Sequence, residues 1–282
     1  MFVFLFIIIA ISLIVIIAVA YVFLTMPRVF DNANMDLLTI NYAHRGLHND
    51  EIPENSLAAY SNAIDNGYGI EIDVQLSSDG EIFVFHDSTA LRMCGVDKKI
   101  FEMTAEEIKL LRLKETDEQI PTLAEVLSLV DGSVPLLIEV KYYADTMKLC
   151  SLLAEALDSY YGSFAIQSFD PRVLRYFKKY RPTFARGQLV AKAPKRSDKA
   201  SPKENDGQNP VVSFLLTHLL LNVLSRPDFI SIQKNHTREL AFILATEVFK
   251  AKAFIWTVKN EKQYDFFRKQ GYHSIFENIR PE

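Results

Sequence analysis

The chain has 282 residues, of which 49% are hydrophobic and 23% charged, and its formal net charge is −4. That length allows one large α/β domain or two smaller ones. The small negative charge gives no reason to expect nucleic acid as a partner.

An uncharged apolar segment opens the chain. In residues 2–25 the apolar run is interrupted by Ser12, Tyr21 and Thr25. A helix of this length spans the ~30 Å hydrocarbon layer, which requires about 20 apolar residues. A cleaved signal peptide is the alternative, because Ala18-Val19-Ala20 resembles a cleavage site. However, no Lys or Arg precedes the run, and it exceeds the usual length of about 7–15 residues. We therefore predict a transmembrane anchor over residues 1–26 and a single-pass membrane protein.

The residues after the anchor bear on its orientation. Residues 27–38 are expected to form a short tether to a domain at 39–282. Arg28 and Arg45 follow the helix and no basic side chain precedes it, so the positive-inside rule places the domain in the cytoplasm. Cys94 and Cys150 fit either a disulfide outside the cell or two thiols inside it.

Two acidic residues lie close together in an early strand. A first strand over residues 39–43 ends at His44, and a capped helix follows it to about residue 67. The next strand carries Glu71 and Asp73 on one face. Because Asp79-Gly80 is a strong turn signal, the chain should then fold straight back. A two-residue turn would set Asp73 opposite His86, and a longer loop would still return His86 to the carboxylates.

A third acid completes an oxygen-rich set. The buried-strand pattern at 135–141 places Glu139 and Lys141 on one face near its C-terminal end. Glu71, Asp73 and Glu139 without cysteine or histidine at ligand spacing describe a site for one divalent cation, Mg²⁺ or Ca²⁺ rather than zinc.

Strands and helices alternate through the rest of the chain. Capping-box patterns at Thr104 and Thr122 predict two helices, and Pro171 suits the first turn of another. Nine candidate strands are present, one of which should lie outside a regular barrel. The alternation favours a barrel or a doubly wound sheet, and reactive groups at successive strand ends favour the barrel.

Two unusual segments follow the sixth of these strands. Residues 191–209 are polar and charged, and we expect a disordered loop. Residues 211–224 are nearly all apolar but too short to span a bilayer. A helix of the barrel's outer ring is the favoured interpretation, and contact with membrane lipid is the alternative.

The polar residues at the strand ends suit phosphate chemistry. Arg45 and Lys141 supply positive charge for an anionic substrate. His44 and His86 can accept and donate a proton. Trp256 fits either stacking on the substrate or a layer of the core. The set is typical of metal-assisted cleavage of a phosphate ester.

These segments together resemble the glycerophosphodiester phosphodiesterase family. The similarity rests on His44-Arg45-Gly46, Pro53-Glu54-Asn55, Glu71-x-Asp73, His86-Asp87, Glu139-x-Lys141, Gln167-Ser168-Phe169 and Trp256-Thr257-Val258. It implies a distorted TIM (β/α)8 barrel that hydrolyses glycerophosphodiesters to glycerol 3-phosphate and an alcohol. The implied roles are acid–base catalysis for His44 and His86, cation binding for Glu71, Asp73 and Glu139, and phosphate contact for Arg45 and Lys141.

Two positions depart from the family pattern. Lys259 stands where the family usually has Asn after Trp-Thr-Val, and Phe276-Glu277-Asn278 stands near the usual Thr-Asp. We expect both to lie outside the acid–base and metal set and to affect substrate recognition. Two other functions fit the same residues, namely a lysophospholipase D that acts on lysophospholipids at the membrane and a non-catalytic, membrane-tethered phosphodiester-binding protein.

Overall fold

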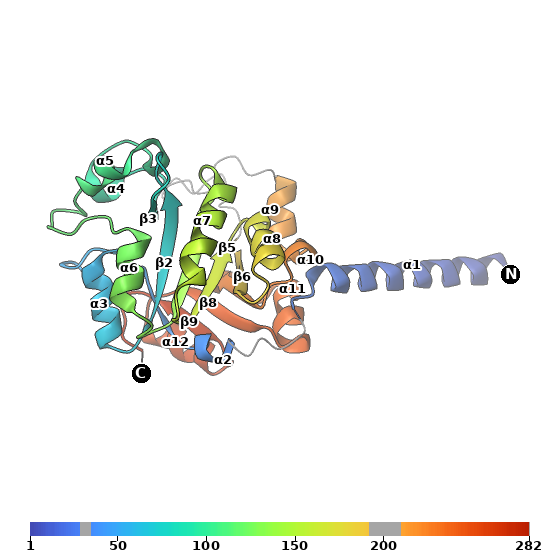
Figure 1. The fold of residues 1–282 in the computed structure, drawn as a ribbon. Coiled ribbons are helices and arrows are strands. Elements are labelled where there is room, and N and C mark those ends of the chain that lie inside the picture. Colours follow the sequence, from blue (N-terminus) through green and yellow to red (C-terminus); the bar gives the residue numbers. More distant parts are fainter. Residues whose placement is uncertain (29–34, 192–209, 282) are drawn as a thin grey trace.

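Eight parallel strands close into a barrel in the computed structural model, which describes residues 1–28, 35–191 and 210–281 (Figure 1). The barrel strands are β1 (Tyr42–His44), β2 (Gly69–Leu76), β4 (Leu136–Val140), β5 (Phe164–Ser168), β6 (Ala185–Val190), β7 (Phe229–Gln233), β8 (Lys252–Val258) and β9 (His273–Phe276). Closure comes from β1, which pairs with both β2 and β9. The predicted TIM barrel is confirmed. The strand outside it is β3 (Ile82–Val84), which pairs antiparallel with β2.

Helices cover the outside of the barrel (Figure 1). Those between the strands are α3 (Leu57–Asp65), α4 (Leu91–Cys94), α5 (Ala105–Lys109), α6 (Leu123–Val130), α7 (Thr146–Asp158), α8 (Pro171–Tyr180), α9 (Pro210–Thr217), α10 (Asn222–Ser225), α11 (Leu240–Ile243) and α12 (Glu261–Arg268). Two 3₁₀ turns, η1 (Ile100–Glu102) and η2 (Lys234–His236), and a π-helical turn, η3 (Leu244–Val248), complete the connections. Both predicted capping boxes are present, at Thr104 and Thr122.

The alternation of side chains along the strands separates an outer core from an inner one. On β2, Ile70, Ile72 and Val74 pack outward against the helices, so Glu71 and Asp73 point into the barrel. The interior also holds an apolar cluster that includes Tyr42, Leu137, Ala165, Ala185, Phe229, Phe254 and Ile275. Gly187 makes room for this packing, since a Cβ atom there would lie 1.9 Å from the Phe229 ring. The apolar layer therefore supports the polar layer above it.

The β2–β3 hairpin differs from prediction by one residue. Val74 pairs with Val84, which places Asp73 opposite Phe85 rather than His86. The loop has three residues, 78–80, because Ser77 already pairs with Glu81, and Gly80 adopts a φ of +100°. His86 nevertheless returns close enough for its charge to act on Asp73, as expected for a longer loop.

The segments outside the barrel also refine the predictions. Helix α1 (Phe2–Thr25) is long and apolar enough to cross a membrane and projects from the side of the barrel (Figure 1). Within the expected tether, α2 (Met35–Leu38) packs Met35 and Leu38 against the inner apolar cluster. The expected disordered loop at 191–209 lies outside the described residues apart from residue 191.

The apolar segment 211–224 forms two helices rather than one. Helix α9 ends at Thr217 and α10 begins at Asn222. Between them Leu219 adopts a φ of +56° and turns its side chain into the core, which ends the first helix. Cys94 and Cys150 are free cysteines in the structure.

Candidate active site

One pocket gathers the residues predicted from the strand ends. It is lined by His44, Arg45, Glu71, His86, Glu139, Lys141 and Trp256, together with Gln167, Phe169, Leu189, Thr257 and Ile275. Asp73 does not line the pocket but lies against it, 1% exposed and in contact with Arg45 and Lys141. All the predicted site residues are therefore brought together, from β1, β2, β4, β8 and the end of the β3 segment.

The three acids meet at one point of the barrel interior. One carboxylate oxygen from each of Glu71, Asp73 and Glu139 lies within 4.8 Å of the others. The register explains the convergence, because β2 pairs in parallel with β4 and sets Asp73 directly beside Glu139. These oxygens can serve as ligands of a hard metal ion.

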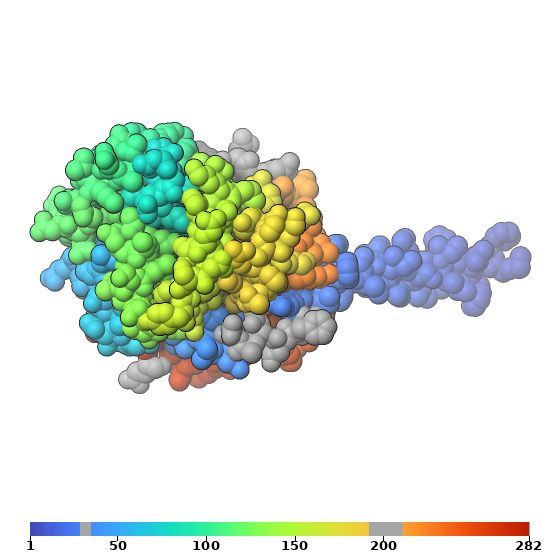
Figure 2. Space-filling view, viewed as in Figure 1, coloured from blue at the N-terminus to red at the C-terminus, as the bar shows by residue number. Residues whose placement is uncertain are grey.

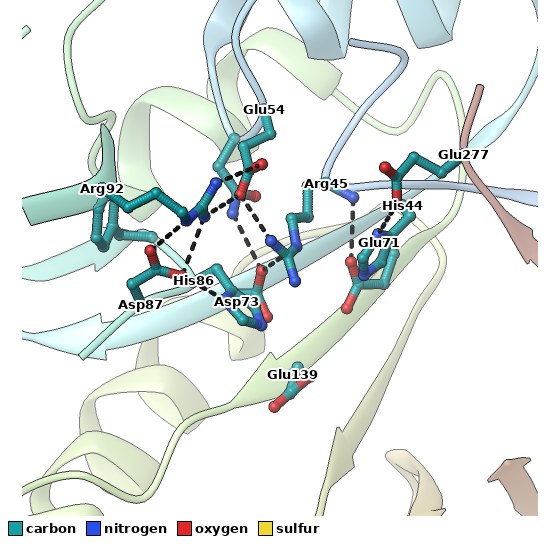
Figure 3. Close-up of polar contacts among 12 residues, drawn as sticks. His44, Arg45, Glu54, Glu71, Asp73, His86, Asp87, Arg92, Glu139 and Glu277 are labelled. Atoms are coloured by element: carbon teal, nitrogen blue, oxygen red, sulfur yellow. Dashed lines mark hydrogen bonds and ion pairs between the residues drawn. The ribbon is translucent and has the colours of Figure 1, made fainter. Parts of the chain in front are cut away.

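Two cations border this acidic cluster. The Lys141 ammonium lies 3.0 Å from Asp73 Oδ1 and 2.7 Å from Glu139 Oε1. The Arg45 guanidinium lies 3.7 Å from Asp73 Oδ2, and the Arg45 backbone N–H donates to Glu71 Oε2 at 3.1 Å (Figure 3). Each cation thus touches the cluster at its edge, where an anionic ligand would also be held.

Burial sets the protonation of the three acids. It raises the pKa of Glu71 well above the usual value, and the negative charges of Asp73 and Glu139 raise it further. Burial likewise raises the pKa of Glu139 despite the Lys141 ammonium. At Asp73 the effect of burial is outweighed by Lys141, His86 and Arg45, so its pKa is lowered. The metal-free cluster therefore favours a proton on Glu71.

Asn55 orients the Asp73 carboxylate through a hydrogen bond. Its amide donates to Asp73 Oδ2 at 3.0 Å, while its carbonyl oxygen accepts from the Tyr60 hydroxyl at 2.8 Å. Ser56 caps α3 by accepting from the Ala59 backbone N–H, so the cap belongs to Ser56 and Asn55 orients the acid. Asp73 Oδ1, close to Lys141, accepts no well-formed hydrogen bond among the described residues. The buried Gln167 Oε1 likewise accepts no hydrogen bond among the described residues.

His86 is held by a carboxylate and a shared arginine. Its Nδ1 lies 2.8 Å from Asp87 Oδ1, and Arg92 of α4 binds both Asp87 and Glu54 (Figure 3). Glu54 in turn accepts from Arg45 at 2.7 Å. The pKa of Asp87 is lowered, because burial is outweighed by His86 and Arg92, so this carboxylate is ionised. An ionised carboxylate can only accept, and Nδ1 of His86 therefore carries the hydrogen.

His44 has a matching partner at the far end of the chain. Its Nδ1 lies 3.3 Å from Glu277 Oε2, and Lys259 donates to the other oxygen of Glu277 at 3.1 Å (Figure 3). Bonding to His44 lowers the pKa of Glu277 to about 2. Lys259 and Glu277 were expected to lie apart from the two histidines, but the structure places Glu277 against His44. The two departures form one ion pair, and it contacts His44.

The surroundings shift the pKa values of the two histidines in opposite directions. Burial, and then the Arg45 guanidinium, lower the pKa of His44 to about 4. Burial and Lys141 also act to lower the pKa of His86, but Asp73 and Asp87 outweigh them and that pKa is raised. Neutral His44 can accept a proton and protonated His86 can donate one.

Part of the pocket wall is apolar. Phe169, Leu189 and Ile275 line it beside Trp256, whose ring meets that of Phe169 edge to face at 5.9 Å. The Trp256 indole Nε1 is buried and has no hydrogen-bond acceptor among the described residues. Trp256 therefore lines the pocket as well as packing against the core, and its indole N–H can donate a hydrogen bond to a ligand.

The parallel barrel and this pocket place the chain among the TIM-barrel proteins that carry their site at the carboxyl ends of the strands. Residues 44–279 match the glycerophosphoryl diester phosphodiesterase family, and the chain belongs to this family.

Individual relatives agree with this assignment. The chain is 36% identical over 164 residues to a glycerophosphodiester phosphodiesterase of Caldanaerobacter subterraneus, covering 54% of this chain and 66% of that one. It is 34% identical over 144 residues to human glycerophosphodiester phosphodiesterase 1, covering 47% of this chain and 43% of that one. The chain thus matches less than two thirds of the length of both relatives.

A solved structure shows the same fold. The chain superposes with a phosphodiesterase of Oleispira antarctica in complex with the product sn-glycerol 3-phosphate, with a TM-score of 0.69 at 24% identity. The superposition covers 86% of this chain and 94% of that one.

Proposed function

We propose that this chain hydrolyses glycerophosphodiesters to glycerol 3-phosphate and an alcohol, with one divalent cation and acid–base catalysis by His44 and His86. The observation that carries the proposal is one pocket lined by two histidines, two cations and two acids, with the third acid, Asp73, directly against it. The Oleispira antarctica phosphodiesterase holds sn-glycerol 3-phosphate as its product, which supports the same product class here.

Glu71, Asp73 and Glu139 would hold the cation. Three buried carboxylates fit a hard ion, and the buried Gln167 Oε1 adds an acceptor that has no hydrogen-bond donor among the described residues. The all-oxygen set suits Mg²⁺ or Ca²⁺. When bound, such an ion polarises a phosphoryl oxygen and lowers the pKa of a coordinated hydroxyl group.

The chain's own side chains bind the phosphate and move the protons. Arg45 and Lys141 neutralise the phosphoryl oxygens, whose negative charge grows in the transition state. Glu277 and Asp87 hold Nδ1–H of the two rings, so Nε2 is the nitrogen whose protonation changes. Neutral His44 takes the proton of the attacking hydroxyl group or water, and His86 protonates the leaving alcohol. If a glycerol hydroxyl group attacks, a water molecule must then open the resulting cyclic phosphodiester to give glycerol 3-phosphate.

Replacing each histidine tests this division of labour. His44→Ala and His86→Ala should each lower the turnover of glycerophosphocholine by about 10²–10⁴-fold, the usual scale of general acid–base help. His218→Ala is the matched control, because His218 packs on Phe214 of α9 and does not line the pocket. Near-full turnover in both variants would refute the proposal.

A lysophospholipase D acting on lysophospholipids is the second candidate. It is favoured by the apolar side of the pocket, where Phe169, Leu189 and Trp256 could receive an acyl chain. Turnover of glycerophosphocholine and of lysophosphatidylcholine separates the two candidates. A purely binding role for the pocket would be indicated if neither substrate released an alcohol.

Residues 1–26 would anchor this activity in a membrane, with 27–38 as tether and 39–282 as the catalytic domain. The anchor is supported by a 24-residue apolar helix, and Arg28 and Arg45 favour a cytoplasmic domain. Protease digestion of intact cells and of permeabilised cells tests this orientation. Loss of the domain from intact cells would place it outside.

A further inference from the structure

Exposed apolar side chains gather around the base of α1. They lie on α9, α10, α11 and η3, and the set is Val212, Phe214, Leu224, Leu240, Ile243 and Val248, here called the α1-side surface. Phe214, Leu240 and Val248 are 56%, 60% and 62% exposed, which is high for large apolar residues. Figure 2 shows the orange residues of this region at the point where α1 leaves the barrel.

The last turn of α1 is hydrogen-bonded to α10 and to the residue that follows α10. Asn222 of α10 donates to the Thr25 carbonyl at 2.9 Å, and Arg226 donates to the Phe23 and Met26 carbonyls at 2.8 Å. The Arg226 guanidinium also lies over the Phe23 ring at 4.6 Å. Thr25 is buried, and α1 contacts both α10 and η3. These contacts fix the direction of α1 relative to the barrel.

A bilayer that surrounds α1 would meet the barrel at this place. The most apolar part of α1 is not buried by the barrel at all. Since the helix leaves the barrel from between the elements of the α1-side surface, the lipid around it would reach that surface first (Figure 1). Apolar side chains at such a position are stabilised when they enter the boundary between head groups and acyl chains.

Basic side chains also lie beside this surface. Lys178 donates to the Leu224 carbonyl of α10. Partial burial, and then the charges of Arg226, Arg186 and Arg175, lower the pKa of Lys178. Arg186 is itself buried and lies 3.7 Å from Asp228, so the cations beside this surface are Lys178, Arg226 and Arg175. The acids nearby, Glu239 and Glu247, contact His236 and Tyr272. A lipid phosphate would relieve the crowding of positive charge.

The topology relates this surface to the pocket. Helix α10 precedes β7 and η3 follows it, so α1 docks outside β7, which stands across the barrel from β2. The acids of β2 therefore lie on the side away from α1. Of the apolar pocket residues, Leu189 and Trp256 lie on β6 and β8, the two strands that flank β7 on the side toward α1.

We propose that the α1-side surface rests on the bilayer spanned by α1, so that the barrel lies on its side with the apolar part of its pocket toward the lipid. This inference rests on the proposed role of α1 as an anchor and not on the reaction. The occupant is a glycerophospholipid bilayer, recognised by apolar insertion around α1 and by the cations beside it.

Site-directed fluorescence on the full chain in vesicles tests the proposal. Phe214→Cys, Leu240→Cys and Val248→Cys are labelled with an environment-sensitive dye in a Cys94→Ser, Cys150→Ala background. The vesicles are phosphatidylcholine with phosphatidylglycerol and contain a nitroxide-labelled lipid as quencher. Leu110→Cys is the control, because Leu110 is 79% exposed and directly follows α5, which lies far from α1 (Figure 1).

The dye at the three test positions should shift to the blue and lose emission to the quencher, at a depth of about 5–10 Å below the head groups. The dye at the control position should do neither. Quenching at positions 214, 240 and 248 no greater than at 110 would overturn the proposal, as would failure of the full chain to float with the vesicles. Hydrolysis is measured separately on the unlabelled chain. A chain that does not hydrolyse the substrate can therefore still give or fail to give the quenching that tests the membrane contact.

Discussion

Each catalytic histidine candidate is paired at Nδ1 with a carboxylate that is itself bound by a cation. For His86 these are Asp87 and Arg92, which are close in sequence. For His44 they are Glu277 and Lys259, and His44 and Glu277 are 233 positions apart. In both rings the carboxylate keeps a hydrogen on Nδ1, so that Nε2 is the nitrogen left to exchange a proton with the substrate.

Glu277→Gln tests the second of these pairs. The amide keeps the shape of the side chain but removes the charge and can present N–H to Nδ1, which disfavours the productive tautomer of His44. We expect kcat to fall by about tenfold or more, within the ~10²–10⁴-fold that acid–base catalysis supplies. Steady-state kinetics on glycerophosphocholine measures the effect.

The matched control is Glu261→Gln, the same substitution in the first turn of α12, which should leave kcat unchanged. Lys259→Gln should have a smaller effect than Glu277→Gln, because the Lys259 side chain is 50% exposed. Equal kcat values for Glu277→Gln and the unsubstituted chain would show that the carboxylate does not position His44.

At the level of elements, the apolar layer inside the barrel supports the polar one. Gly187 on β6 is the tightest point of that layer, because the Phe229 ring fills the space of a side chain. Gly187→Ala should therefore lower the free energy of unfolding by about 1–3 kcal/mol, the usual cost of overpacking. Urea unfolding in detergent measures this change.

Gly67→Ala provides a comparison for this substitution. A methyl group there meets nothing within 4 Å, and the cost comes from a φ of +71° alone. We expect Gly187→Ala to lose more stability than Gly67→Ala. The reverse order would mean that the β6–β7 contact is loose and does not support the pocket floor.

Local signals in the sequence predicted most elements because their causes are local. Thr104 and Thr122 cap their helices through residues three positions away, and the strand pattern of β2 sets Glu71 and Asp73 inward. The hairpin register was missed by one residue, because the Ser77 hydroxyl bonds within the loop and ends the pairing early. The break at Leu219 depends on tertiary packing, which the apolar run alone does not encode.

Partnerships between distant residues could not be predicted in this way. The motifs located both histidines, but the contact of His44 with Glu277 exists only because β9 closes the barrel beside β1. Arg92 and Glu54 join through the segment after β3 in the same manner. The departure of Lys259 and Glu277 from the family pattern was the available signal, and their opposite charges pointed to a pair.

At the level of the whole molecule, stability is linked to the acidic cluster. In the metal-free protein the pKa of Glu71 is raised by burial, then by Asp73 and Glu139, so folding favours its neutral form. This contribution is present at a pH below the ordinary Glu value near 4.5 and is lost as the pH rises through the raised value. With chelator present, we therefore expect Glu71 to make the folded state less stable at pH 8 than at pH 5.

Urea unfolding of the chelated protein at the two pH values measures this effect, and Glu71→Gln isolates it. The variant removes the titrating group, so its loss of stability between pH 5 and pH 8 should be smaller. Added Mg²⁺ or Ca²⁺ should stabilise the unsubstituted chain more at pH 8, because cation binding requires ionised ligands. An identical pH dependence in the chain and in Glu71→Gln would refute this linkage.

In the whole molecule, three buried acids lie together and two histidines line the pocket beside them. The most direct measurement is the release of glycerol 3-phosphate from glycerophosphocholine by the chelator-treated full chain as Mg²⁺ or Ca²⁺ is added back. We predict no release with chelator, recovery with at least one of the two ions, and no recovery in Glu139→Gln at the same ion concentration. Full turnover in the presence of chelator, or no turnover with either ion, would contradict a cation held by Glu71, Asp73 and Glu139.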